Sequence, residues 1–248
     1  MLKKELLTVD EVADILRTTP NTIYRWLRSG KMAGVKIGKE WRIDQKTLEM
    51  MLKSHRDVAP PDESYLDKIH PQHDHVLVVT SNSHELYDLE TDYFLKGMAK
   101  GHRLFKGCWW QHPDDVRHEL TARGLPVESL ESSDALVIVD LDKQYRRKGI
   151  TEPVKSWEEE AKKTVTLGHG TMWGSGSPHL LACNGNVSGL IDFESLLDKV
   201  LKNLPVVGIC PYVFENCITD YYEPFIDLVN HHRSLIFYNA NKAAYLKN

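Results

Sequence analysis

The sequence is poor in cysteine and has no long apolar run. Its four cysteines are widely spaced and form no C-x-x-C pair, which indicates reduced intracellular thiols rather than a disulfide framework. No stretch approaches the roughly 20 apolar residues that span a bilayer, and the first residues lead directly into a helix signal without a signal peptide. We therefore expect a cytoplasmic protein with no membrane contact. The cysteines are Cys108, Cys183, Cys210 and Cys217.

Several signatures of catalysis and cofactor binding are also missing. The apolar segment Val76–Thr80 is followed by Ser-Asn-Ser-His, which lacks the glycines and the lysine of a phosphate-binding loop. There is no G-x-S-x-G nucleophile elbow. No histidine pair shows i, i+4 spacing with a third ligand nearby. We therefore expect no catalytic residues, cofactor or metal, and we interpret the 12 histidines as solvated or capping residues.

Two cysteines deserve separate interpretations because of their places in the sequence. Cys210 ends an apolar, strand-like segment, where a cysteine usually behaves as a small apolar side chain. Cys217 follows in a loop-like segment, so it is the better candidate for a reactive thiol.

Charge is distributed unevenly along the chain. The net charge is −4, yet residues 1–56 contain 12 Lys and Arg against 7 Asp and Glu, so the acidic excess lies in the remainder. A basic segment ahead of an acidic body predicts nucleic-acid binding by the first part alone. The 248 residues suit a small domain at 1–54, a proline-containing linker at 55–72 and an ordinary domain at 73–248.

Residues 7–52 have the pattern of a winged helix-turn-helix. Thr8 and Glu11 form a capping box that predicts a helix from Val9 to about residue 17. Thr19 and Pro20 open a second helix over 21–29, whose outward positions suit reading of a major groove. Segments 35–37 and 41–43 then predict a hairpin with one apolar face and a basic outer face for phosphates. A third helix is expected over 45–53, and Trp26 and Trp41 are expected in the core.

This segment resembles the excisionase-type, MerR-related winged helix of bacterial regulators. The resemblance rests on LTVDEVADIL, TIYRWLRSGKM and VKIGKEWRI, which occur in that order. It implies contact with double-stranded DNA, although scattered basic residues on their own are equally typical of a solvated face. The residues to which the resemblance assigns DNA contact are Asn21, Thr22, Tyr24, Arg25, Arg28, Lys36, Lys39 and Arg42.

The rest of the chain alternates strand-like and helix-like segments. Short apolar runs separated by helical periodicity predict a mostly parallel sheet with helices on both faces. The uninterrupted, β-branched run 135–140 is expected to be the central strand. The other expected strands are 76–80, 104–110, 180–183, 205–210 and 235–238, and the expected helices are 84–100, 113–124, 153–167, 187–204 and 222–230.

Ligands of such sheets bind beyond the carboxyl ends of the strands. The loops expected at that edge are 80–83, 109–112, 140–145, 172–178 and 211–216. They mix aromatic and polar side chains, which suits a small, partly apolar ligand. The candidate ligand-binding residues are Ser81, Trp109, Asp142, Tyr145, Trp173 and Tyr212.

The body resembles the MEDS family, the sensory domain of methanogens, methylotrophs and the dichloromethane regulator. The resemblance is carried by HDHVLVVT, FLKGMAKGHRLF, ALVIVD, IDFESLL and LPVVGICPY. It implies a RecA-like α/β fold without a phosphate-binding loop, and sensing of small hydrocarbon derivatives. Many members have Gly-Glu-Met-x-Trp where this chain has Gly174–Pro178, so the role of that acid is not carried over. A winged helix followed by this domain resembles the architecture of a dichloromethane-responsive repressor.

Together these features predict a sequence-specific transcriptional regulator. We expect the N-terminal domain to bind an operator as a homodimer, because one module buries little surface alone. The α/β domain is expected to sense a small organic effector, such as a one-carbon compound or a halogenated hydrocarbon. Two alternatives are a DNA-tethered enzyme that acts on a small metabolite and an excisionase-like recombination accessory protein. The first would need catalytic groups that the sequence does not show, and the second rarely carries so large a body.

Overall fold

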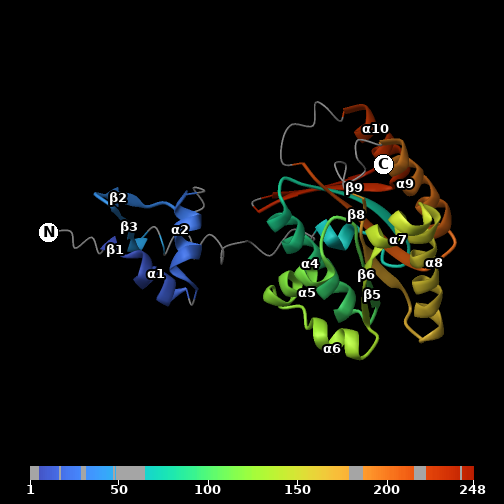
Figure 1. Cartoon of the computed structure of the whole chain (residues 1–248), viewed down its shortest axis with the longest axis horizontal. Coiled ribbons are helices and arrows are strands. Elements are labelled where there is room, and N and C mark those ends of the chain that lie inside the picture. Colours follow the sequence, from blue (N-terminus) through green and yellow to red (C-terminus); the bar gives the residue numbers. More distant parts are fainter. Residues whose placement is uncertain are drawn as a thin grey trace. The chain divides into compact units, whose positions relative to one another are not determined.

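The computed structural model divides the chain into two compact units, residues 1–62 and 63–248 (Figure 1). No described helix is long and apolar enough to cross a membrane. The short helix η1, Tyr65–Lys68, lies within the segment that was expected to be a linker. Leu66 and Ile69 are buried in the core of the second unit, so the prediction that 65–72 belongs to the linker is wrong. The structure describes residues 6–16, 18–28, 32–46, 48, 65–178, 187–214, 222–240 and 242–248.

The first unit, which we call the head, contains the capped helix that was predicted to start at Val9. The Thr8 Oγ1 accepts a hydrogen bond from the Glu11 amide at 3.2 Å, and Glu11 Oε2 accepts one from the Thr8 amide at 2.7 Å. The strands pair in the order β1-β3-β2, and the expected third helix lies mostly outside the described residues. The elements are β1 (Leu6–Leu7), α1 (Val9–Ile15), α2 (Pro20–Arg28), β2 (Val35–Ile37) and β3 (Glu40–Asp44).

The hairpin of β2 and β3, which we call the wing, distributes its side chains differently from the expectation. Ile37 pairs with Glu40 across the two-residue turn, and Val35 pairs with Arg42. Paired residues share a face of a sheet and a shift of one residue exchanges the faces, so Lys36 lies on the side of Trp41, opposite Arg42. The prediction of one basic face and one apolar face is therefore wrong. The side chains of Val35 and Ile37 are 61% and 55% exposed.

The second unit, the body, is built on a seven-stranded sheet. The strand order is β10-β9-β4-β8-β7-β5-β6, and every pairing is parallel except that of β9 with β10. This architecture confirms the predicted mostly parallel α/β fold. The strands are β4 (Asp74–Thr80), β5 (Arg103–Cys108), β6 (Leu136–Asp140), β7 (Met172–Ser175), β8 (Val206–Val213), β9 (Ser234–Asn239) and β10 (Lys242–Lys247).

Helices cover both faces of this sheet (Figure 1). Along β4, Val76 and Val78 pack into one core and Leu77 and Val79 into the other, which explains why the strand is apolar without alternation. The first face, which we call the α4 face, carries α4 (Ser83–Ala99), α5 (Pro113–Ala122) and α6 (Val127–Ser132). The second face, the α9 face, carries α7 (Leu141–Lys148), α8 (Thr151–Thr166), α9 (Val187–Leu201) and α10 (Tyr222–His231).

Two strands differ from their predictions, and β10 was not predicted. The run expected to be central, β6, is an edge strand, and it is apolar because helices of both layers still cover it. The segment that includes β7 was expected to be a loop, yet β7 lies between β5 and β8 in the sheet. Gly174 favoured a loop in the prediction, but in the structure it is required by packing. A Cβ at this position would lie 2.3 Å from a ring carbon of Trp157. Residues 180–183, where a strand was expected, lie outside the described residues.

This contact predicts a large effect of a single methyl group. Gly174→Ala should lower the free energy of unfolding by about 1–3 kcal/mol, because the core must shift to admit the methyl. Gly170→Ala is the matched control, since its nearest neighbour would be 3.8 Å away and its effect should be small. Denaturation by urea checks both variants, and equal stability of the two would contradict the packing described here.

Candidate DNA-binding surface and sensory site

The exposed side of α2 is the candidate surface for base contacts. Ile23 and Leu27 are buried in the head, whereas Asn21 on the other side is exposed. Positions 25 and 28 follow position 21 at i+4 and i+7, so they belong to the same helix face. Arg25 and Arg28 therefore occupy suitable positions, although their side chains lie outside the described residues.

Two other predicted contacts on α2 also have structural roles. The Thr22 hydroxyl shares a hydrogen bond of 3.0 Å with that of Thr19, at the start of the helix. Tyr24 is half-buried and packs against the core of the head. Trp26 and Trp41, which were expected in the core, are likewise half-buried and pack against it. The ring of Tyr24 is thus only partly turned outward.

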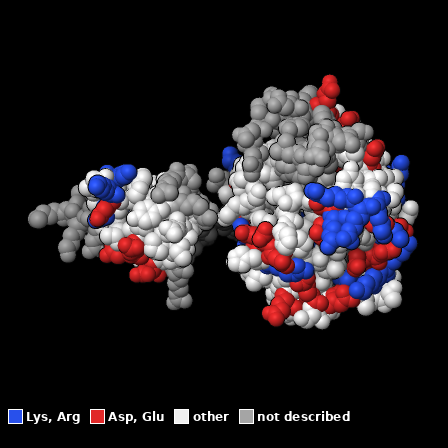
Figure 2. Space-filling model, in the orientation of Figure 1, with Lys and Arg blue, Asp and Glu red and all other residues white. Residues whose placement is uncertain are grey.

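The wing carries three of the described basic side chains of the head, and Lys46 follows it. Lys36 and Lys39 are exposed. Arg42 is half-buried, donates a hydrogen bond of 3.0 Å to the carbonyl of Trp41 and forms an ion pair with Glu40. Figure 2 shows basic side chains over the wing and acidic ones over α1. A phosphate at Arg42 would have to compete with the carboxylate of Glu40.

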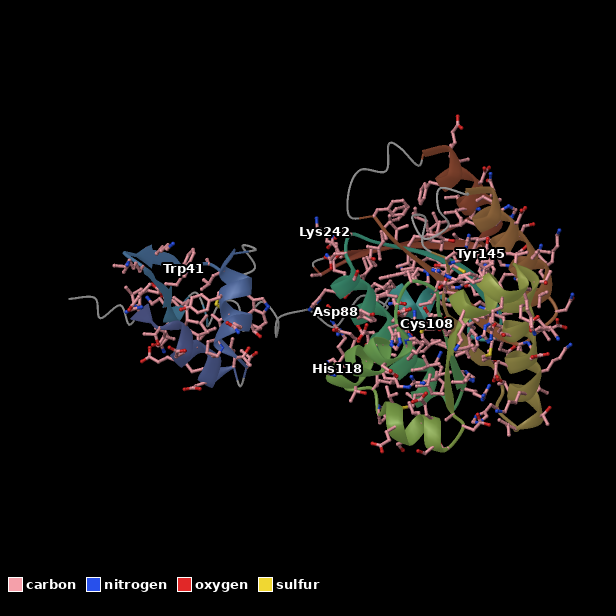
Figure 3. The ribbon with its side chains drawn as sticks, in the orientation of Figure 1. Trp41, Asp88, Cys108, His118, Tyr145 and Lys242 are labelled. Carbon is pink, nitrogen blue, oxygen red and sulfur yellow. The ribbon has the colours of Figure 1, made fainter. Side chains whose placement is uncertain are left out.

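In the body, the structure brings together two of the predicted ligand-binding residues. Trp109 follows β5 directly, and its ring lies 5.8 Å from that of Tyr145 on α7 and 5.0 Å from that of Phe193 on α9. We call these three residues the aromatic corner. The indole nitrogen of Trp109 is buried and has no hydrogen-bond partner in the described part of the chain. Tyr145 is labelled in Figure 3.

The other four predicted residues lie apart from this corner or have partners of their own. Ser81 donates a hydrogen bond of 2.6 Å to Glu85, and Asp142 pairs with Arg146 at 2.7 Å. Trp173 is fully buried on the α4 face, stacked 4.7 Å from Tyr93. Tyr212 is buried on the α9 face. The expectation that Trp173 lies in a loop at the sheet edge is wrong, because it belongs to β7.

A buried polar group that the sequence interpretation missed lies near the carboxyl edge of the α4 face. Lys106 Nζ lies 2.6 Å from Glu90 Oε1, and the Ser175 hydroxyl donates to the same oxygen. All three residues are at most 1% exposed. The second oxygen, Glu90 Oε2, has no partner among the described side chains and backbone. The signal in the sequence was a lysine inside an otherwise apolar strand.

A second missed group lies on the α9 face. His75 of β4, Glu194 of α9, Cys210 of β8 and His232 after α10 are all buried, and one ligand atom of each lies within 4.8 Å of the others. We call this group the His–Cys cluster. The interpretation of histidines as solvated or capping is wrong for these two. Cys210 likewise has polar contacts, at 3.2 Å from His75 Nε2 and 3.3 Å from Glu194 Oε2.

The pKa values of the cluster are strongly coupled. Burial disfavours the charged form of His75, but the carboxylates of Asp198 and Glu194 outweigh it and raise its pKa to about 9. Burial would raise the pKa of Glu194, yet the contact with His75 holds it below its ordinary value. Burial and Glu194 raise the pKa of Cys210 far above that of a free thiol. Burial and the charge of His75 lower the pKa of His232 to about 4.

The ion pair of Lys106 and Glu90 gives a test of the body. Lys106→Met should destabilise the body by about 3–5 kcal/mol, because it leaves a buried carboxylate without its partner. Adding Glu90→Gln should restore most of that loss. Lys143→Met, at an exposed position, is the control. Urea unfolding followed by near-ultraviolet circular dichroism measures these three variants and Glu90→Gln alone. A double variant whose loss equals the sum of the two single losses would contradict the pairing.

Comparison with known proteins agrees with this division of the chain. The helix-turn-helix domain family matches residues 6–56. Two proteins of Mycobacterium tuberculosis, from strains CDC 1551 and H37Rv and named as candidate DNA-binding proteins, are 36% identical over 52 residues, which is 21% of this chain and 67% of theirs. The N-terminal unit is therefore a helix-turn-helix domain.

Solved structures share the fold of the body. A protein of Pyrococcus horikoshii in complex with an unknown peptide has a TM-score of 0.54 at 11% identity, covering 73% of this chain and 84% of its own. A KaiC-like protein of Pyrococcus horikoshii OT3 has a TM-score of 0.51 at 12% identity, covering 71% and 79%. The MEDS family, described as the methanogen/methylotroph, DcmR sensory domain, matches residues 74–233. Because that match spans more than half of the sequence, the chain belongs to the MEDS family.

Proposed function

We propose that this protein is a ligand-responsive transcriptional regulator. The observation that carries the proposal is the presence in one chain of a helix-turn-helix domain and a MEDS sensory domain. The basic wing supplies charge for the phosphates, and the exposed face of α2 supplies Asn21 and the positions of Arg25 and Arg28 for base edges. The acidic body is poorly suited to bind DNA itself.

The head acts as one half of a symmetric pair in this proposal. A single small module buries too little surface for tight, specific binding, whereas two heads on adjacent major grooves double the contacts. An operator with two related half-sites one helical turn apart would match such a dimer. The body would supply the contacts between the two copies.

The effector that best fits the body is a small, largely apolar organic molecule. The aromatic corner offers ring faces and one unpartnered indole N–H, which suits a one-carbon compound or a halogenated hydrocarbon. Such a molecule controls DNA binding only if it binds one arrangement of the protein more tightly than the other. An effector at the aromatic corner would contact Phe193 on α9 and Tyr145 on α7, so its binding could change the positions of both helices.

The DNA-binding half of the proposal is tested at α2. Arg25→Ala should weaken binding to an operator fragment from the protein's own upstream DNA by roughly 1–3 kcal/mol, or about 5- to 150-fold, if Arg25 contacts a base. Arg147→Ala on α7, an exposed arginine of the body, should leave the affinity unchanged. Mobility shift at fixed salt measures both, and equal affinities of the two variants would contradict the assigned interface.

The sensing half is tested with the same DNA fragment. Dichloromethane or another one-carbon compound should change the dissociation constant about 5- to 150-fold, the usual range of allosteric coupling. Tyr145→Ala should reduce this response without altering DNA affinity in the absence of effector. Tyr245→Ala, on β10, is the control and should respond like the unaltered protein. If Tyr145→Ala responds fully, the effector binds elsewhere.

A further inference from the structure

We propose that the His–Cys cluster is a binding site for a divalent transition metal ion, and that Zn²⁺ is the ion it fits best. The cluster contains two imidazoles, one thiol and one carboxylate, all within the buried α9 face of the sheet. It combines residues from β4, α9 and β8 with one that follows α10. No single stretch of the sequence shows the spacing of a metal site, because the fold assembles it from four segments.

Four of the six distances between the donor atoms suit a tetrahedral site. Zn²⁺ binds nitrogen and oxygen at roughly 2.0–2.2 Å and sulfur at about 2.3 Å, which places neighbouring ligand atoms roughly 3.3–3.6 Å apart. Glu194 Oε2 lies 3.3 Å from Cys210 Sγ, 3.4 Å from His75 Nε2 and 3.5 Å from His232 Nε2. The His75 Nε2 lies 3.2 Å from the same sulfur. These four distances suit a common central ion, and the remaining two, from His232 Nε2 to His75 and to Cys210, are at most 4.8 Å.

Three of the four proposed ligands have a neighbour outside the cluster, as ligands in established metal sites do. The Nδ1 of His232 lies 2.6 Å from the carbonyl of Leu228, and the Nδ1 of His75 lies 3.6 Å from Asp198 Oδ1. The Tyr212 hydroxyl donates a hydrogen bond of 2.5 Å to Glu194 Oε1, which leaves Oε2 directed at the cluster. These contacts direct the Nε2 atoms and one carboxylate oxygen to the same point.

The contact between His232 and Glu194 supports a cation most directly. A carbonyl can only accept, so the hydrogen on the His232 ring belongs to Nδ1 and the neutral ring has a bare lone pair at Nε2. This Nε2 is buried, has no hydrogen-bond partner in the described part of the chain and faces a carboxylate oxygen, which also only accepts. Two lone pairs at this distance repel each other, and a metal ion between them converts the repulsion into two bonds.

The donor types select the class of metal. Mg²⁺ and Ca²⁺ require six or more ligands, nearly all oxygen, whereas imidazole and thiolate favour zinc and its neighbours in the first transition row. On binding, the thiol of Cys210 and any protonated Nε2 release their protons to water. With four protein ligands the coordination is closed, which is the form of a structural site rather than a catalytic one. The ion would fix α9 and the end of α10 on the sheet.

The test uses the full chain, loaded during folding because the site is buried. The purified protein should contain one Zn²⁺ per chain. When it is refolded with Co²⁺, it should show a thiolate-to-cobalt charge-transfer band and the intense visible bands of tetrahedral cobalt. Cys210→Ser should lose the charge-transfer band. Cys108→Ser is the matched control, because Cys108 is also buried and free but lies on the α4 face (Figure 3), and it should keep the band.

A second variant separates metal binding from simple folding defects. Asp198→Asn removes only an outer partner, so it should weaken Zn²⁺ binding about 10- to 100-fold while the charge-transfer band persists. Competition with a chromophoric chelator measures the affinities, and far-ultraviolet circular dichroism verifies that each variant is folded. The proposal is overturned if the unaltered protein gives no cobalt–thiolate band, or if folded Cys210→Ser binds Zn²⁺ as tightly as the unaltered protein.

Discussion

The body depends on one constraint, the burial of its parallel sheet on both faces. Strands covered on both faces have no solvated side on which to place polar groups, so any polar side chain within them needs a buried partner. Lys106 meets this requirement with Glu90, and His75 and Cys210 meet it with Glu194. Lys106, His75 and Cys210 thus each contact an acid from a covering helix.

This constraint explains how much of the body was predictable. Continuous apolar runs identify β4, β8 and β9, and helical periodicity identifies α4, α8 and α9. The strand β7 escaped prediction because its glycine is required by Trp157, a residue of another element. The central position given to β6 was wrong because helices cover both faces of an edge strand as well. Sequence alone shows that a strand is buried, whereas its place in the sheet depends on contacts between distant segments.

In the candidate sites too, contacts between residues close in sequence were predictable, and contacts between distant segments were not. The capping box of Thr8 and Glu11 was predictable, because both partners lie within one turn of helix. The wing faces were not, since the pairing of Ile37 with Glu40 is set by the turn and a shift of one residue reverses every side chain. The His–Cys cluster was missed for a related reason. Its members are separated by up to 157 positions between residues 75 and 232, and only the fold brings them together.

The ion pair on the wing has a consequence for how the head responds to ionic strength. Each phosphate neutralised by a free basic side chain releases close to one condensed cation from DNA. Arg42 already has an internal counterion in Glu40, so its transfer to a phosphate exposes a carboxylate that attracts a cation back. The wing therefore contributes a smaller salt dependence than its number of basic residues implies. The contribution of the wing to DNA affinity should therefore vary less with salt concentration than that of a wing with three free basic side chains.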